Sequence, residues 1–458
     1  MSHHSARRPQ RSSGPAPEVS TGPGPNGQRS EHGSVLDDSP RPAAPMPVPD
    51  GPPTVVAPAA DERIPALDGL RGLAILLVMN FHFFLHGLFL GNPHRVAADR
   101  IALRITGVGW SGVDLFFVLS GFLITGILYD SRTRASRYFQ TFYARRALRI
   151  FPIYYGLLVL LMLLFPVIVP SGRPSVDALV DNRFWYYTYT VNMRALFGQS
   201  FTLDFSITGH LWSLAVEEQF YLIWPAVVLL FGRRGLMRFC VVAMIAAPLL
   251  RVVLDATGYS SVQPRALMPA RLDTLAVGAA VALVARDPGG LARLGRFVRP
   301  SAAAAFAVLV ALYVIRDGLR QEDVWVETLG LSAMAFFWGS LLVGVLLAAR
   351  DSRLATTFRN PVLRWFGRYS YALYLVHLPV AALVYLRFNI PADVITVSGS
   401  QLPGTIVFWV VAGGISTVLA VLSWNLIEKQ FLTLKSAFPY ASANVRSNAV
   451  SSTAPASG

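Results

Sequence analysis

The sequence is poor in cysteine, in lysine and in charged residues altogether. Cys240 is the single cysteine of the 458 residues, so no disulfide can form within the chain and no cysteine cluster can bind a metal. Lysine occurs only at Lys429 and Lys435, so arginine supplies 38 of the 40 cationic residues. Charged residues make up 14% of the chain and hydrophobic residues 53%, a balance that excludes an ordinary soluble globule.

Long apolar runs are what the sequence has in abundance. A helix needs about 20 apolar residues to cross the hydrocarbon core of a bilayer. The pattern predicts an all-α fold, a polytopic membrane helix bundle with about ten transmembrane helices. The predicted spans are 69–90, 107–130, 151–170, 212–231, 236–256, 270–285, 300–316, 327–349, 369–388 and 404–427.

The formal net charge of +14 does not indicate nucleic-acid binding, because most arginines flank the apolar spans. Their distribution follows the positive-inside rule and predicts a multi-pass protein of the plasma (inner) membrane with both termini cytoplasmic. Residues 171–211 then form the largest outer loop. Its aromatic cluster at 184–187 fits the membrane interface, and 184–200 would equally suit a re-entrant segment or an eleventh span.

The two ends of the chain differ from the membrane part, which we place at 63–432. Residues 1–62 are rich in Pro, Gly, Ser and Ala, and the first sixty hold 13 of the 31 prolines. Such a composition cannot bury enough apolar surface to fold, so we predict a disordered extension, and it has no apolar segment of a signal peptide. Residues 433–458 are likewise predicted to be a disordered tail.

The first predicted span carries an arginine and a histidine, Arg71 and His82. Eleven residues correspond to three turns and about 20°, so both side chains share one face, roughly 16 Å apart in depth. Asp68 lies one turn before Arg71 on the same face. Ionisable residues within a membrane span mark functional sites by default, although Arg71 alone could anchor the helix at the interface and His82 could be an interhelical hydrogen-bonder.

Two further spans carry acidic residues. Glu217 and Glu218 are adjacent within an apolar span that begins at His210, and we expect one to face the bundle and the other a partner or the interface. Asp114 lies near the outer entry of the second span, where it could also be an exposed interfacial carboxylate. Ser120 and Gly121, in the same span, are small enough to allow close helix packing.

Arginines gather in the inner loop before the third span. Arg145 and Arg149 are i and i+4 on one helix face, beside Arg146, which suits a phosphate clamp, a topology signal or an anionic-lipid patch. Later in the chain, Arg271 and Asp273 could form a local charge pair at the start of the sixth span.

His377 lies about 12 Å into the ninth span, near the midplane, where a packed, hydrogen-bonded histidine is an equal alternative to a functional one.

The ionisable residues of the spans are sorted by depth. Fixed cations gather on the inner side and the other ionisable groups lie midway or outward. This layout suits an anionic ligand from the cytoplasm and a neutral hydroxylic ligand from outside.

Six stretches in the same order resemble the acyltransferase-three family of integral-membrane acyltransferases, which includes O-antigen and peptidoglycan O-acetylases. The resemblance covers about residues 63–432, and the chain resembles the stand-alone type without an extracytoplasmic hydrolase-like domain. The matching stretches are 67–82, 112–124, 142–155, 210–225, 271–282 and 367–379.

The resemblance implies an O-acyltransferase that moves an acyl group, most simply acetyl, from cytoplasmic acyl-CoA to a hydroxyl of a glycan or glycosylated metabolite, without a metal. Its arginine–histidine pair falls on Arg71, for the donor or the oxyanion, and His82, as base or acyl carrier. The phosphates of the donor would meet the inner-loop arginines, and the acidic residues would orient the histidine or hold the acceptor. The inner-loop arginines are Arg145, Arg146 and Arg149, and the acidic residues are Glu217, Glu218 and Asp114.

The main rival is a transporter or exporter of a glycan or small solute that uses the intramembrane charges as a relay. The two halves of the chain show no convincing inverted repeat, which disfavours it. No feature of the sequence specifies an oligomeric state.

Overall fold

A computed structural model describes residues 64–85, 96–133, 137–168, 174–197, 205–258, 264–388 and 395–440. Within these ranges the chain is helical, with a single isolated β-bridge between Val397 and Ser400, so the predicted all-α fold is confirmed. The predicted tails 1–62 and 441–458 lie outside the described residues. Residues 433–440, also expected in the tail, belong to the described structure and include a short 3-10 helix, η9 (Leu434–Ala437).

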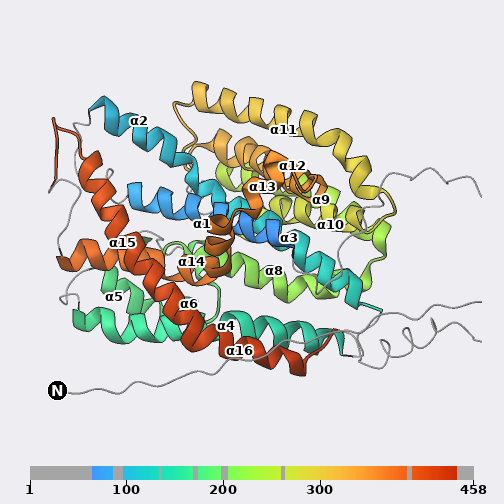
Figure 1. The fold of residues 1–458 in the computed structure, drawn as a ribbon, viewed down its shortest axis with the longest axis horizontal. Helices are drawn as coiled ribbons and strands as arrows, with labels where there is room; N and C mark the ends of the chain where they lie inside the picture. The colour runs from blue at the N-terminus through green and yellow to red at the C-terminus, as the bar shows by residue number, and fades with distance from the viewer. Residues whose placement is uncertain are drawn as a thin grey trace, which may run out of the picture. The chain divides into compact units, whose positions relative to one another are not determined.

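Sixteen α-helices follow one another along the described chain (Figure 1). The first eight are α1 (Pro65–Phe84), α2 (Ala97–Thr106), α3 (Gly112–Ser131), α4 (Tyr138–Ile168), α5 (Pro174–Asp181), α6 (Arg183–Tyr187), α7 (Phe205–Thr208) and α8 (Leu211–Leu230). The others are α9 (Arg233–Ala256), α10 (Leu272–Ala285), α11 (Gly290–Ile315), α12 (Leu331–Leu347), α13 (Arg353–Arg359), α14 (Pro361–Phe388), α15 (Leu402–Ser423) and α16 (Lys429–Thr433).

Eight helical stretches of the described chain are long and apolar enough to cross a membrane. The two other predicted spans are helices as well. α10 has 14 residues, fewer than the roughly 20 that a straight crossing requires. α14 has 28 residues, more than a straight crossing requires. The stretches are Pro65–Phe84, Ala97–Ser131, Tyr138–Ile168, Leu211–Leu230, Arg233–Ala256, Gly290–Ile315, Val326–Leu347 and Leu402–Ala437.

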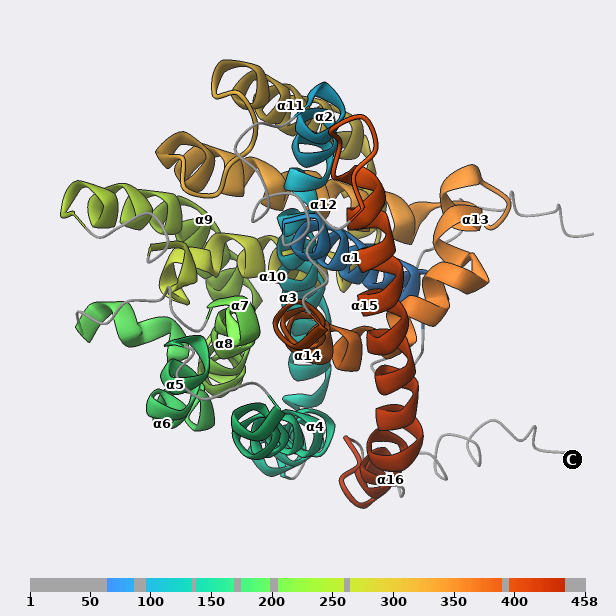
Figure 2. The ribbon, with the colours of Figure 1, turned by 90° about the vertical axis from the view of Figure 1, so that its left-hand side faces the viewer.

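Two helix pairs form the centre of the bundle, α1 with α14 and α3 with α10. Figure 2 shows α1, α3 and α10 in the middle, with α9 and α11 on one side and α13 and α15 on the other. Glycines allow these close approaches. A methyl group on Gly367 would lie 1.7 Å from the carbonyl oxygen of Asp68, and one on Gly278 would lie 2.0 Å from that of Val118. The packing of α1 on α14 brings the first predicted span against the ninth.

The peripheral helices α9 and α11 present apolar side chains outward. Only 22% and 17% of their most apolar segments are buried, against 83% for the segment that contains α3. Side chains such as Ile245 and Val314 are largely exposed in the protein alone. Exposed apolar faces of this length fit a surface covered by lipid.

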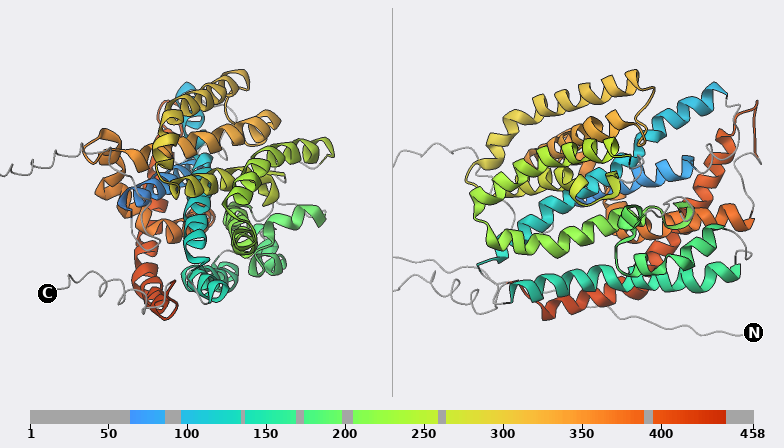
Figure 3. Two further views of the ribbon diagram at one scale, coloured as in Figure 1. Left: turned by 90° about the vertical axis from the view of Figure 1, so that its right-hand side faces the viewer. Right: turned by 180° about the vertical axis from the view of Figure 1, so that it is seen from behind.

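The predicted outer loop contains short helices. α6 has five residues and the 3-10 helix η3 (Val191–Phe197) has seven, so the described residues between 184 and 197 form no further span. The aromatic cluster packs on α4 instead, because the hydroxyls of Tyr154 and Tyr155 donate to the carbonyls of Tyr186 and Tyr187. At the other end of α4, the chain after α15 returns along it through α16 and η9 (Figure 3, right).

Candidate active site

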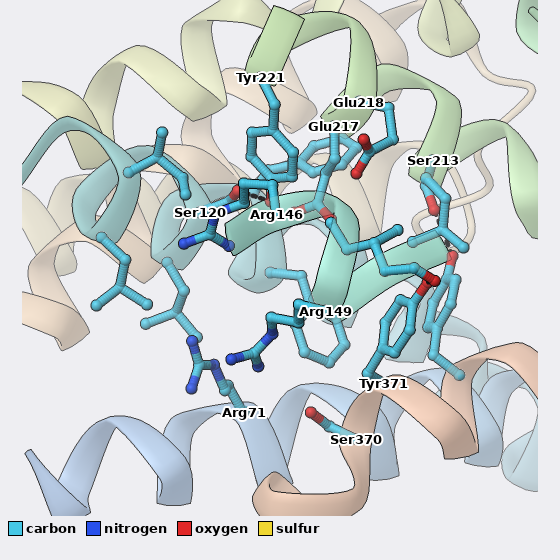
Figure 4. A pocket seen from close by; sticks show the side chains of 18 of the residues that line it. Arg71, Ser120, Arg146, Arg149, Ser213, Glu217, Glu218, Tyr221, Ser370 and Tyr371 are labelled. Atoms are coloured by element: carbon cyan, nitrogen blue, oxygen red, sulfur yellow. Dashed lines mark hydrogen bonds between the residues drawn. The ribbon is translucent and has the colours of Figure 1, made fainter. Parts of the chain in front are cut away.

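A cavity of about 210 Å³ lies between α1, α3, α4, α8 and α14. Its cations come from α1 and α4 and its two carboxylates from α8, while serine and tyrosine hydroxyls complete the polar lining (Figure 4). The cavity thus brings together five of the ionisable residues that the sequence indicated. Its polar lining consists of Arg71, Ser120, Arg146, Arg149, Ser213, Glu217, Glu218, Tyr221, Ser370, Tyr371 and Tyr374.

Three guanidinium groups share this cavity. Arg149 lies within electrostatic reach of both Arg71 and Arg146, and Figure 4 shows the guanidinium groups of Arg71 and Arg149 close together. Arg71 is 3.4 Å from the carboxylate of Asp68. In the described part of the chain, Arg146 and Arg149 form neither a hydrogen bond nor an ion pair, and Arg146 lies 5.5 Å from the ring of Tyr221. Because three guanidinium groups line the cavity and outnumber its two carboxylates, this lining can bind an anion such as a phosphate.

Both carboxylates of α8 line the cavity. Glu217 is within electrostatic reach of Arg146 and Arg71. It lies beside Ser120, whose hydroxyl is hydrogen-bonded at 2.6 Å to that of Tyr221. The expectation that only one of Glu217 and Glu218 would face the bundle is wrong, because the cavity extends far enough around α8 to reach two neighbouring side chains. Of the two small residues expected to allow close packing, Gly121 makes the close approach, to the backbone of Leu275, while Ser120 has a polar contact.

Arg145 contacts the C-terminal segment, not the cavity. Its guanidinium donates to the carbonyls of Lys435 and Phe438 at 3.2 and 3.0 Å, and the ring of Tyr440 lies 4.5 Å away. The predicted pairing of Arg145 with Arg149 therefore gives way to Arg146 with Arg149, which at i and i+3 also share a helix face.

His82 is buried outside the described lining of the cavity. Arg71 and His82 both face the interior of the bundle, as their spacing predicts, but they meet different neighbours. Nδ1 of His82 is 3.0 Å from Nε2 of His377 on α14. Tyr374, one turn before His377, lines the cavity, and its hydroxyl contacts the hydroxyl of Ser213 and the carbonyl of His210. Tyr374 and Ser213 therefore lie between the arginines of the cavity and the histidines.

His210, just before α8, completes the group of histidines. Its ring centre is 5.0 Å from that of His377, and its Nε2 is 3.3 Å from the carbonyl oxygen of Leu375. Burial, reinforced by the neighbouring His377, lowers the pKa of His210 well below its usual value. His210 is therefore neutral near pH 7 and donates from Nε2 to the carbonyl.

The remaining predicted residues belong to an ion-pair network on the other side of α3. Arg271 pairs with Asp114 at 2.5 Å, and Arg251 of α9 holds Asp273 through two bonds of 2.8 and 3.2 Å. The local pair expected between Arg271 and Asp273 is thus replaced by pairs to other helices. Asp114 is fully buried, so it is not an exposed interfacial carboxylate.

Sequence reasoning missed Arg251 and the tyrosines of the cavity. Arg251 interrupts the apolar run of α9, the same signal that drew attention to Arg71. Tyr221 follows Glu217 by four residues, and Tyr374 precedes His377 by three, so helical spacing could have placed each beside its predicted neighbour.

Comparison with known proteins adds to this geometry. The family described as an acyltransferase domain matches residues 64–425, which is most of the chain and contains every residue of the cavity and the histidine group. The chain belongs to this acyltransferase family. Its apolar helices and its membership make it a membrane protein.

Similar proteins with curated names are O-acetyltransferases of Staphylococcus aureus. A putative O-acetyltransferase of strain COL is 29% identical over 394 residues, covering 80% of this acyltransferase and 57% of the relative. The O-acetyltransferase OatA of strain COL is 28% identical over 352 residues, covering 72% and 53%. The chain thus spans about half the length of these relatives. No solved structure matches it.

Proposed function

We propose that the protein is a membrane O-acyltransferase that transfers an acyl group, in the first instance acetyl, from cytoplasmic acyl-CoA to a hydroxyl of a glycan or glycosylated metabolite. The observation that carries the proposal is the cavity, which gathers the three guanidinium groups of Arg71, Arg146 and Arg149 against only two carboxylates, both from α8. The relatives named as O-acetyltransferases support the acetyl group and the oxygen nucleophile. An inner-membrane location with cytoplasmic termini is part of the proposal.

The donor fits the cavity by charge and in part by size. Guanidinium groups bind phosphate oxygens in a bidentate manner, so the arginines would hold the phosphates of coenzyme A. At about 210 Å³ the cavity is smaller than the roughly 300–1,000 Å³ of pockets for drug-sized ligands, so it would hold only part of the donor. The acyl end would then extend between α8 and α14 toward Ser213 and Tyr374, in the direction of the histidines.

Acyl transfer breaks the carbon–sulfur bond of the thioester and forms a carbon–oxygen bond to the acceptor. The thiolate leaves as the thiol after gaining a proton, and the acceptor hydroxyl loses one. His82 would take that proton or carry the acyl group between donor and acceptor. Arg71 would stabilise the donor phosphate or the oxyanion that forms on the thioester carbonyl. Glu217 and Glu218 would orient the acceptor hydroxyl or the donor from α8.

Membrane vesicles that contain the protein test this function with radiolabelled acetyl-CoA. We expect release of free CoA and transfer of label to alkali-labile esters, both abolished in His82→Ala. Ser416→Ala is the matched control, because Ser416 is buried on α15 and bonds only within its own helix among the described residues. Label on the protein itself after acid quenching would identify an acyl carrier. Full transfer in a folded His82→Ala variant would contradict the role of His82. Solute flux in proteoliposomes without acetyl-CoA, with no transfer of label by the wild type, would contradict the acyltransferase and favour a transporter.

A further inference from the structure

His82 contacts a second histidine that comes from the far end of the chain. Nε2 of His377 lies 3.0 Å from Nδ1 of His82, a hydrogen-bond distance that requires one of the two nitrogens to donate and the other to accept. His82 is 8% exposed and His377 is not exposed at all, so burial favours the neutral form of both rings. The question is which nitrogen of each ring carries the proton.

The backbone of α14 answers this question for His377. Its Nδ1 lies 2.7 Å from the carbonyl oxygen of Tyr374 and 3.1 Å from that of Leu373. A carbonyl oxygen can only accept a hydrogen bond, so Nδ1 of His377 must carry a proton. A neutral imidazole has one such proton, and Nε2 of His377 is therefore an acceptor.

The protonated nitrogen of His82 follows from that of His377. If Nε2 of His377 accepts, Nδ1 of His82 must be the donor and carries the single proton of its neutral ring. The lone pair of His82 then resides on Nε2, the nitrogen that faces away from His377. The helix carbonyls of α14 thus determine, through two imidazoles, which nitrogen of His82 is basic.

We propose that His377 is a positioning residue that holds His82 in the tautomer with a basic Nε2. This inference rests on the proposed function of His82 as the group that reacts at the acyl-transfer step. When Nε2 of His82 takes the proton of the acceptor hydroxyl, the oxygen forms the ester bond and the thiolate leaves. The resulting imidazolium still donates its Nδ1 proton to Nε2 of His377. His377 gains and loses no atom, and it performs the orienting role that a carboxylate has in a Ser-His-Asp triad.

A neutral imidazole suits this role in an apolar interior. A buried carboxylate without a counter-ion would be costly there, whereas a neutral ring whose nitrogens are both hydrogen-bonded is not. The neighbouring side chains include the aromatic rings of Phe83 and Tyr374, at 6.2 and 5.7 Å from His377, and the ring of His210. These neighbours fix the ring of His377 in place.

Two amide substitutions separate positioning from packing. In His377→Gln the amide reaches the position of Nε2, where its oxygen can accept from Nδ1 of His82. In His377→Asn the amide reaches only the position of Nδ1, so it can bond to the carbonyl of Tyr374 but not to His82. We expect His377→Gln to retain kcat within about tenfold. We expect His377→Asn to lower kcat by about 10²- to 10⁴-fold, as loss of the correct tautomer does in serine proteases.

The assay is label transfer from acetyl-CoA in membrane vesicles, with Ser416→Ala as the control for a distant buried change on α15. The KM for acetyl-CoA should stay unchanged in both His377 variants, since the cationic cavity is not altered. An equal loss in the two variants, or a milder effect of His377→Asn, would overturn the positioning role and leave a packing role. If the wild-type protein transfers no label, the proposed function itself has failed, and the two failures are thereby distinguished.

Discussion

The bundle contains two polar regions that use arginine in opposite ways. In the ion-pair network, Arg271 and Arg251 each face a carboxylate from another part of the chain, at 2.5 and 2.8 Å. In the cavity, Arg146 and Arg149 have no such partner in the described part of the chain, and Arg71 has only the 3.4 Å contact with Asp68. Paired charges hold helices together, whereas a group of repelling cations around a space is suited to an anionic ligand.

The largest effect should come from breaking one pair of the network. Arg251→Met leaves the buried Asp273 without its counter-ion, and we expect a loss of about 3–5 kcal/mol in the free energy of unfolding. The double variant Arg251→Met with Asp273→Leu should recover most of that loss, because an apolar pair needs no compensation. Unfolding midpoints of the detergent-solubilised protein measure this. A double variant as unstable as the single one would show that the pair is not the source of the stability.

A smaller effect, on binding and not on folding, is expected in the cavity. Arg149→Gln removes a charge that forms no ion pair within the described ranges, so the unfolding midpoint should stay the same or rise. The KM for acetyl-CoA should increase about 10- to 100-fold through the loss of a charge-assisted hydrogen bond. Arg145→Gln, four residues earlier on α4, is the matched control and should change KM less than threefold, since Arg145 bonds to the C-terminal segment. Equal KM values for acetyl-CoA in the two variants would show that Arg149 does not contribute more than Arg145 to donor binding.

The smallest effect should come from an ion pair at the protein surface. Asp287, in the turn before α11, is bonded by Arg233 at 2.8 Å, and this hydrogen bond lowers the pKa of its carboxyl below 3.8. A carboxyl whose pKa is lower in the folded state stabilises the fold at pH values above its pKa in the unfolded chain. This contribution is lost as the pH falls through the lower pKa of the folded state. Asp287→Asn should therefore lower the unfolding midpoint slightly near pH 7.

The difference in unfolding midpoint between the wild type and Asp287→Asn should also depend on salt concentration. The midpoints of wild type and Asp287→Asn should converge at acid pH and in about 1 M salt, where screening acts over roughly 3 Å. The buried pair of Arg251 should show no such convergence with salt. If the two pairs responded alike, burial would not be what separates the network from the surface.

The sequence predicts much of this arrangement because helical spacing determines which side chains share a face. Arg71 and His82 both point into the bundle, as eleven residues of helix require. The glycines on either side of Arg71 are explained by close packing of α1, with Gly69 against Phe358 of α13 and Gly72 against Leu363 of α14. The number of crossing helices is less predictable, since α10 has only 14 residues.

Contacts between distant segments are what the sequence does not reveal. Asp114 and Arg271 are 157 residues apart and His82 and His377 are 295 apart, and spacing within a helix does not indicate which helix packs opposite. For a related reason, the sequence did not indicate that Arg146 and not Arg145 would share the cavity with Arg149. Adjacent residues differ by 100° on a helix, and the packing of the C-terminal segment against α4 decides which of them turns toward the cavity.

The packing of α3 against α10 has a consequence for how the protein can move. The two helices touch at Gly121 and Gly278, and the bidentate pair of Asp130 with Arg286 ties them together at the cytoplasmic end predicted for them. α4 is different, because only 29% of its most apolar segment is buried. One wall of the cavity is therefore held by helix packing and an ion pair, whereas much of α4, which forms another wall, is exposed to the surroundings of the bundle. If the arginines of α4 bind the phosphates of a donor as proposed, we expect the lipids around α4 to affect the KM for acetyl-CoA more than substitutions between α3 and α10 do.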